Sequence, residues 1–349
     1  MQKCRKRGDM FRVDKLKYYD KFHCIMDKCP ENCCEMNWNI LVDEAAYRKY
    51  QACDDEKIRD FISSEMPHKI VKKDGKCPFF QKDGLCMLHK EYGETFLCET
   101  CRNYPRFTSL YEDLYIVSLA PSCPAVLDIL WETDKSEIQS ETFYEAEEEL
   151  DRKQIELSKS LEKKLKLRER FINILHNREI GLGECVEQIK DEMEITGDYQ
   201  EVSEQAAWMI AFVKENCLIN DKIRGQSLLI NGELSENIQE DIEKLTEIYS
   251  EFRILFEHIL VYSVFEQVLQ IEDENEEAKQ DWLEKICLRL ATIQYWILYL
   301  YKAKGDIDRE DCNIAVYSIM RVLDHDQKQW KAYDKAWKQT GWGLPKILW

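Results

Sequence analysis

The sequence predicts a mainly α protein, in which a loop-rich, cysteine- and metal-binding N-terminal module packs on a C-terminal helical domain. Three observations support this fold class. Long segments after residue 130 have helical periodicity and little strand-like alternation. Eleven of the 15 cysteines lie within the first 123 residues. The net charge of −18 arises wholly after residue 130. We therefore expect two domains, residues 1–130 and residues 131–349.

In the first domain, residues 1–20 are basic and polar and predict a short arm. Residues 43–62 open with an acidic cap and show helical spacing. "KDGKCPFF" and "QKDGLCML" indicate glycine turns, each delivering a cysteine into a short extended piece or a helix start. Residues 122–131 predict another helix, with Pro124 in its first turn.

In the second domain, residues 136–177 are charged and periodic, which predicts one long amphipathic helix, broken at most once. "GLGE", which contains Gly181 and Gly183, predicts a turn between helices. Further helices are expected at about 199–217, 235–271, 277–304 and 308–337. The ending "KQTGWGLPKILW" predicts an irregular tail that packs down.

The composition also restricts where the protein works. No apolar run resembles a signal peptide or a membrane span. Residues 252–271 come closest, but their charged residues predict a buried soluble helix. We therefore expect a cytoplasmic location, no membrane partner, and free thiols in place of disulfides. The acidic balance argues against a nucleic-acid partner, because phosphate binding needs a basic face.

Nine cysteines form a candidate metal constellation. In chain order they read Cys24-x4-Cys29-x3-Cys33-Cys34, then Cys77, Cys86, Cys98-x2-Cys101 and Cys123. One zinc ion or one cubane iron–sulfur cluster needs four ligands, so nine thiols exceed one site. The spacing leaves zinc and iron–sulfur both open. Adjacent side chains diverge, so we expect only one thiol of the neighbouring Cys33–Cys34 pair to serve a given ion.

Four segments carry a family resemblance: "FHCIMDKCPENCCEMNWNILVDEAAYRKY", "CPFFQKDGLCML", "YGETFLCETCRNYPR" and "SLAPSCPAVLDIL". In this order they resemble the flagellin lysine-N-methylase family, within a wider group of cysteine-motif proteins thought to chelate iron or zinc. The resemblance implies an iron–sulfur cluster (4Fe-4S), S-adenosylmethionine as methyl donor, and flagellin lysines as acceptors. Cys98 is a thiol beyond the family set. The metal ligands implied are Cys24, Cys29, Cys33, Cys34, Cys77, Cys86, Cys101 and Cys123.

Such chemistry needs a proton acceptor, because only the neutral amine of lysine attacks a methyl group. Tyr104, Glu35 and Glu99 lie in or beside the cysteine motifs and are candidates for this role. Arg106 could bind the carboxylate of S-adenosylmethionine or form a structural salt bridge, and Trp38 is assigned to the same cofactor site. No glycine-rich nucleotide loop follows a strand, so a doubly wound α/β cofactor site is not expected.

Two other functions fit the same cysteines. A non-catalytic metal could hold together the N-terminal module, which is too rich in loops to fold alone. Alternatively, Cys33–Cys34 or Cys98–Cys101 could switch redox state as a sensor. A cavity beside the metal, deep enough for a nucleoside, would favour the enzyme.

Overall fold

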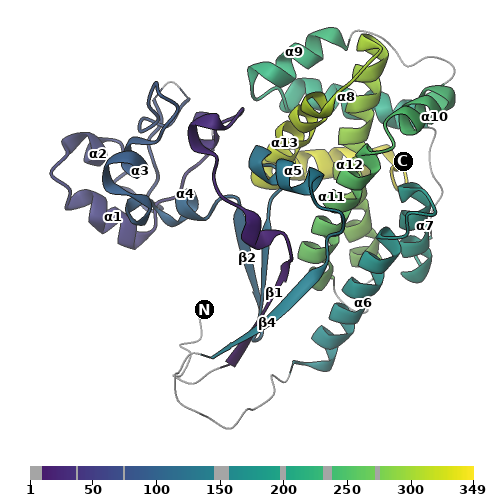
Figure 1. Cartoon of the computed structure of the whole chain (residues 1–349), viewed down its shortest axis with the longest axis horizontal. Coiled ribbons are helices and arrows are strands. Elements are labelled where there is room, and N and C mark those ends of the chain that lie inside the picture. Colours follow the sequence, from purple (N-terminus) through teal and green to yellow (C-terminus); the bar gives the residue numbers. More distant parts are fainter. Residues whose placement is uncertain are drawn as a thin grey trace. The chain divides into compact units, whose positions relative to one another are not determined.

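A computed structural model describes residues 10–36, 38–73, 75–144, 157–196, 202–230, 238–271 and 276–349. Most of these residues are helical, and the strands form one small sheet (Figure 1). The prediction of a mainly α protein is confirmed.

The chain divides into two compact units. We call residues 22–107, together with Cys123–Ala125, the cysteine unit, and the remainder the helical unit. The dividing points differ from the predicted boundary at residue 130, because the segments ending at Lys21 and Ser122 group with the helical unit. The physical reason is a shared sheet, in which strands from before and after the cysteine unit pair with each other.

The sheet has the strand order β2-β3-β1-β4. Strand β1 is parallel to β3, with Arg12 opposite Leu114, and antiparallel to β4, with Met10 opposite Tyr144. Parallel neighbours require a long crossover connection, and this crossover contains the cysteine unit. The strand bounds are β1 Met10–Leu16, β2 Arg106–Tyr111, β3 Leu114–Leu119 and β4 Ile138–Tyr144.

A buried ion pair fixes β1 to the helices. Asp14 on β1 is fully buried and accepts hydrogen bonds from Arg12 and from the fully buried Arg168 of α6 (Lys159–Leu175). Ser140 on β4 donates to the same carboxylate at 2.7 Å. Burial by itself would raise the pKa of Asp14, but the hydrogen bond from Arg12 and the charge of Arg168 hold it below its usual value. One carboxylate thus joins two strands and a helix.

Two helices form the centre of the helical unit. In α11 (Phe252–Gln267) and α12 (Glu276–Lys304), long stretches are buried on every side, as expected of helices surrounded by protein. Figure 1 shows them among the other helices of this unit. Those other helices are α5 Pro124–Trp131, α7 Leu182–Glu192, α8 Val202–Asn216, α9 Asp221–Leu229, α10 Ile238–Ile248, α13 Arg309–His325 and α14 Gln327–Thr340.

One predicted helix is wrong over part of its length. The segment 136–177 was expected to be helical, yet Ile138–Tyr144 forms β4 and the helix begins at Lys159. Residues 145–156 of this prediction lie outside the described residues. The strand forms because Ile138–Tyr144 pairs along all of β1 and ends in Thr142, Phe143 and Tyr144, residue types that favour strands. Long-range pairing therefore outweighs the helical propensity of the flanking glutamates.

The expected helices at about 199–217 and 277–304 are confirmed within the described residues by α8 and α12, and the first-domain helix that starts at Pro124 is confirmed by α5. The expected helices 235–271 and 308–337 are each divided in two, into α10 and α11 and into α13 and α14, and α9 was not predicted. The C-terminal tail also packs down: Leu344, Ile347 and Leu348 are buried. A Cβ at Gly183 would lie 2.7 Å from the Ile347 carbonyl oxygen, so the "GLGE" turn needs glycine where the tail crosses it.

The cysteine unit is built from short elements. Its helices are η2 Met26–Lys28, η3 Cys33–Glu35, α1 Glu44–Gln51, α2 Glu56–Asp60, α3 Met87–Tyr92, η4 Glu94–Phe96 and α4 Glu99–Asn103. The 3₁₀ helix η1 Tyr19–Lys21 belongs to the helical unit, as does η5 Val268–Gln270. Among the helices of the described ranges, none combines the length and the apolar character needed to cross a membrane.

We expect Asp14→Ala to destabilise the helical unit strongly. The substitution leaves Arg168 buried without its partner carboxylate, which costs about 3–5 kcal/mol. The control is Asp20→Ala, which removes an exposed partner of Lys15 and costs less than about 1 kcal/mol. Urea unfolding measures both free energies, and equal losses would contradict the assigned role of Asp14.

The buried Glu284 on α12 should make the free energy of unfolding depend on pH. Burial raises the pKa of Glu284 to about 7, with a further contribution from Asp334. The native state then holds a proton that the unfolded state releases above pH 4.5, so its stability falls as the pH rises from about 4.5 to 7. We expect Glu284→Gln to remove this loss. Between pH 5 and pH 8 the advantage of the variant over the wild type in unfolding free energy should grow by about 1–3 kcal/mol. A pH-independent difference in unfolding free energy would contradict the assignment.

Candidate functional site

The turn that carries Cys33 and Cys34 is held by one asparagine. The Asn32 side chain caps η3 by accepting from the Cys34 amide at 3.2 Å, and its amide nitrogen donates to the Gly84 carbonyl at 3.2 Å. This second bond ties the turn to a loop fifty residues further along the chain. Asn32 therefore sets the position of two thiols relative to that loop.

The same loop carries Cys77 and Cys86. Cys77 donates its amide hydrogen to the Cys34 carbonyl at 3.1 Å, and Phe80 forms an antiparallel bridge with Cys86. The chain reverses at Gly84, whose φ of +79° favours glycine. Backbone hydrogen bonds thus bring both cysteines next to the Cys33–Cys34 turn.

Four thiols meet as a result, and we call Cys33, Cys34, Cys77 and Cys86 the thiol quartet. The side chains of Cys33, Cys77 and Cys86 all lie within hydrogen-bonding reach of the Cys34 thiol, and these contacts, together with burial, raise the pKa of Cys34. Adjacent thiols were expected to diverge, yet those of Cys33 and Cys34, both in the 3₁₀ turn η3, interact.

Cys86 is one of the quartet thiols whose pKa is lowered. The hydrogen bond from Cys34 and the backbone amides of His89 and Leu88 lower the pKa of Cys86 to about 6. The hydrogen bond from Cys34 also lowers the pKa of Cys77. The quartet therefore has thiolate character near neutral pH, which is the form that binds metals.

Cys98 and Cys101 form a second thiol contact. Their side chains share a hydrogen bond, which lowers the pKa of Cys98 and raises that of Cys101. The charges of Cys33 and Cys77 also raise the pKa of Cys101, so the Cys98–Cys101 pair lies near the quartet. Cys98 was left out of the predicted ligand set as an extra thiol. The Cys-x2-Cys spacing was the signal that could have included it.

The donor chemistry of the quartet fits a zinc ion or an iron–sulfur cluster, since two sulfurs from the η3 turn and two from the loop of residues 77–86 converge. No three histidine, cysteine or carboxylate side chains in the described ranges, however, already stand in the arrangement of a metal site. The thiols contact one another directly, and a metal would take the place of these sulfur–sulfur hydrogen bonds.

Three further predicted ligands, Cys24, Cys29 and Cys123, have the following surroundings. Cys24 is exposed and within electrostatic reach of Cys33 and Arg106. Cys29 donates to the Glu31 carbonyl at 3.3 Å. Cys123 is buried beside the start of α5 and groups with the cysteine unit.

The predicted acid–base residues have other partners. Glu35 is exposed and forms an ion pair with Lys76 at 2.8 Å. Tyr104 packs its ring edge-on against Trp38, with centroids 5.0 Å apart. Glu99 is exposed and begins α4, where its amide donates to the carboxylate of Asp43. Neither glutamate is desolvated in the way that usually tunes a carboxylate for proton transfer.

The side chain of Arg106 contacts Phe22, another residue of the cysteine unit. Its guanidinium lies 4.8 Å from the centroid of the Phe22 ring and donates to the Phe22 carbonyl at 3.3 Å. No salt bridge of Arg106 accompanies these contacts among the described residues. The hydrogen bond uses one of five N–H groups, so the guanidinium keeps donors for a carboxylate.

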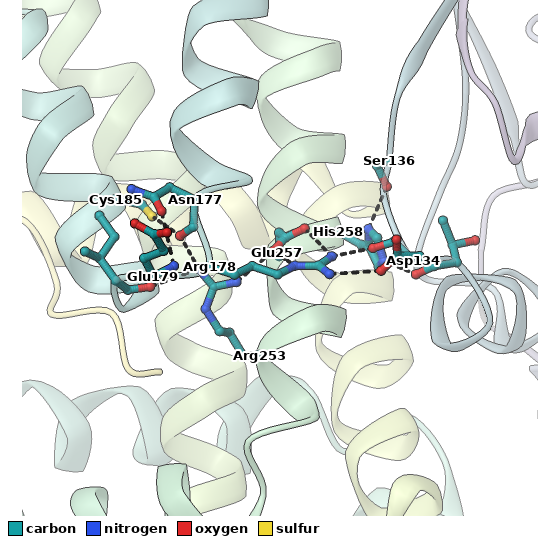
Figure 2. A network of polar contacts seen from close by, with 11 residues as sticks. Asp134, Ser136, Asn177, Arg178, Glu179, Cys185, Arg253, Glu257 and His258 are labelled. Carbon is teal, nitrogen blue, oxygen red and sulfur yellow. Dashed lines mark hydrogen bonds and ion pairs between the residues drawn. The ribbon is translucent and has the colours of Figure 1, made fainter.

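The helical unit contains a polar network that is structural (Figure 2). Glu257 on α11 is fully buried and accepts from Arg178 at 2.9 Å and from Arg253 at 2.7 Å. Arg253 also donates to the carbonyls of Asn177 and Ile180. The two arginines thus clamp the loop that follows α6 onto α11.

His258 extends this network on the next residue of α11 (Figure 2). Its ring nitrogens bond to the Ser136 hydroxyl at 2.6 Å and to the Thr133 carbonyl at 2.7 Å. Burial lowers the pKa of His258, so the ring is neutral near pH 7. Because both nitrogens have protein partners, His258 positions the loop before β4 and does not face a substrate.

Comparison with known proteins shows the family of the chain. A flagellar biosynthetic protein, FliU, of Salmonella muenchen is 30% identical over 118 residues, which span 68% of its length and 30% of this chain. The chain belongs to the flagellin lysine-N-methylase family. Two proteins named lysine-N-methylase support this: the one of Salmonella typhimurium is 28% identical over 140 residues, and that of Salmonella choleraesuis is 29% identical over 136 residues.

The family match is partial. It spans about a third of the length of the two lysine-N-methylases and 36% and 35% of this chain. No family model matches the sequence, and no solved structure matches it.

Proposed function

We propose that this member of the flagellin lysine-N-methylase family is a protein-lysine N-methyltransferase that acts on flagellin in the cytoplasm. The observation that carries the proposal is the convergence of the thiol quartet in a chain related to lysine-N-methylases. The flagellin substrate is supported by the name of the relative FliU.

The cysteine unit is the proposed metal-binding part. Cys33, Cys34, Cys77 and Cys86 would hold a 4Fe-4S cluster, with zinc as the alternative, and Cys98 with Cys101 provides two neighbouring thiols. When bound, the metal group would supply a Lewis-acidic centre that orients the methyl donor. Thiol side chains themselves bury little apolar area, so metal binding would also stabilise this unit.

S-adenosylmethionine is the proposed methyl donor. Arg106 would bind its carboxylate through the N–H groups that Phe22 leaves available, and Trp38 would contact its aromatic base. A lysine amine first loses a proton to a base. Its nitrogen pair then forms the N–C bond as the C–S bond breaks, and the sulfur keeps that electron pair.

Metal content tests the first part of the proposal. We expect anaerobically purified protein to contain iron and sulfide, and Cys34→Ser to lower the metal content severalfold because Cys34 lies at the centre of the quartet. Cys53→Ser is the matched control: Cys53 is half-buried and contacts Tyr92. Elemental analysis and absorption spectroscopy measure the content. Zinc without iron, with methylation retained, would exclude the cluster.

Methyl transfer tests the second part. Flagellin incubated with the protein and S-adenosylmethionine should gain methyl groups on surface lysines, detected by peptide mass spectrometry. Cys34→Ser should lose this activity and Cys53→Ser should keep it. Flagellin that stays unmodified by the metal-loaded protein would contradict the enzyme and favour a non-catalytic Fe/Zn-binding module.

The contact between Cys98 and Cys101 supports a second candidate, a thiol redox sensor. In this function, a peroxide takes two electrons from the pair, the two thiols release two protons, and a Cys98–Cys101 disulfide forms. Reversible disulfide formation in a protein that neither binds metal nor methylates flagellin would favour the sensor.

A further inference from the structure

The helical unit contains a cavity of about 310 Å³ beside α6. Four parts of the chain form its walls: α6, the end of α7, residues 268–271 around η5, and the first turn of α12. Helix α6 packs against both α7 and η5, and Figure 1 shows α6 alongside α7. Cavities that bind small molecules measure about 300–1,000 Å³, so this one has room for a compact ligand.

The lining of this cavity is strongly cationic. Within the described residues, five cationic side chains and one carboxylate, Glu192, line it; the cations are Lys163, Lys164, Lys166, Arg170 and Lys279. The whole chain has a net charge of −18, so this gathering of cations is opposite in sign to the overall composition. A positive potential focused in a cavity attracts anions and repels cations.

Three of these cations have no carboxylate partner. Arg170 forms an ion pair with Glu192 at 2.7 Å, which ties α6 to α7. Lys163, Lys166 and Lys279, in contrast, form no ion pair with any described residue. Lys163 and Lys166 are exposed and Lys279 is half-buried, so a charged group can reach them from solvent. Their ammonium groups are available for charge-assisted hydrogen bonds to an anion.

The deeper lining of the cavity is aliphatic. Met193, Val268 and Ile271 line it and are buried, and Leu167 is half-buried. No aromatic ring stands among its described lining residues, so it offers no platform on which a nucleotide base could stack. A ligand that enters meets cations first and aliphatic side chains further in. This order suits an anion that carries an alkyl chain.

A second hollow, of about 500 Å³ and more open to solvent, adjoins the cavity. The two share Lys166, Arg170 and Glu192. The second hollow is lined mostly by polar side chains, such as Asn173 and Gln188, and gives a solvated approach along α6. The smaller cavity, where the lysines and the buried aliphatic side chains occur together, is therefore the candidate site.

We propose that the cavity beside α6 binds a small aliphatic anion, either a carboxylate or a phosphate monoester with a short alkyl chain. Lys163, Lys166 and Lys279 contact the anionic head, and Met193 and Val268 contact the chain. Lysine provides a compact point charge that pairs with either head. The inference goes beyond methyl transfer and does not rest on it, because the cationic sulfonium of S-adenosylmethionine would be repelled by these lysines.

Isothermal titration of the full-length protein with octanoate and with octyl phosphate tests the site and distinguishes the two heads. We expect at least one of them to bind, one molecule per chain, and more weakly as the salt concentration rises. Octanol lacks the charge, octyltrimethylammonium reverses it, and inorganic phosphate lacks the chain. Each of these three should bind at least about tenfold more weakly. Equal binding of any of them would refute the ligand class, and binding of neither octyl anion would refute the site.

Removal of the lysine charges tests the assigned residues. Combining Lys166→Met with Lys279→Met keeps unbranched side chains but removes two charges, and we expect it to weaken binding by about tenfold or more. Lys335→Met is the matched control, since Lys335 is an exposed lysine of α14 that does not line the cavity. The control should bind as the wild type does, and circular dichroism checks that each variant is folded. Equal weakening by the control and the double variant would overturn the assignment.

Discussion

The burial of Asp14 is the constraint on which the fold depends. A carboxylate in the middle of a sheet is tolerated only because Arg12 and Arg168 neutralise it. This contact holds β1 between β3 and β4 and against α6. Along the chain, the main segment of the cysteine unit, residues 22–107, follows β1 and leads into β2. This segment is therefore an insertion between strands of one sheet.

Within that insertion, cysteines occupy positions that larger apolar side chains fill elsewhere. Its helices are short, and Cys77 and Cys98 are part of the hydrophobic core with Tyr50, Ile58 and Leu88. Small side chains bury little apolar area, so the arrangement makes physical sense where a metal supplies the missing cohesion. The same reasoning explains why backbone hydrogen bonds through Asn32 and Gly84 are needed to align the loops.

The sequence predicted the helices well and the site only in part. Helical periodicity is local, so both ends of α12 and the start of α13 were predicted to within a residue, whereas the break between α13 and α14 was missed. Strand β4 could not, because its pairing with β1 involves residues over a hundred positions away. The cysteine motif located the quartet, yet spacing does not encode which thiols touch. Glu35 was selected for its closeness to the motif along the chain, although its carboxylate lies in solvent beside Lys76.

Glu257 shows what such a selection leaves out. Along the sequence it is one charge in the apolar stretch 252–271, and its charge there only argued against a membrane span. In the fold it is fully buried and accepts hydrogen bonds from Arg178 and Arg253. A solvated carboxylate gains little from meeting a guanidinium, since water already stabilises both ions. A buried carboxylate gains much more, because the two arginines replace the water that folding removed. This difference in solvation, which no local pattern in the sequence reveals, makes Glu257 the group that holds the loop after α6 against α11.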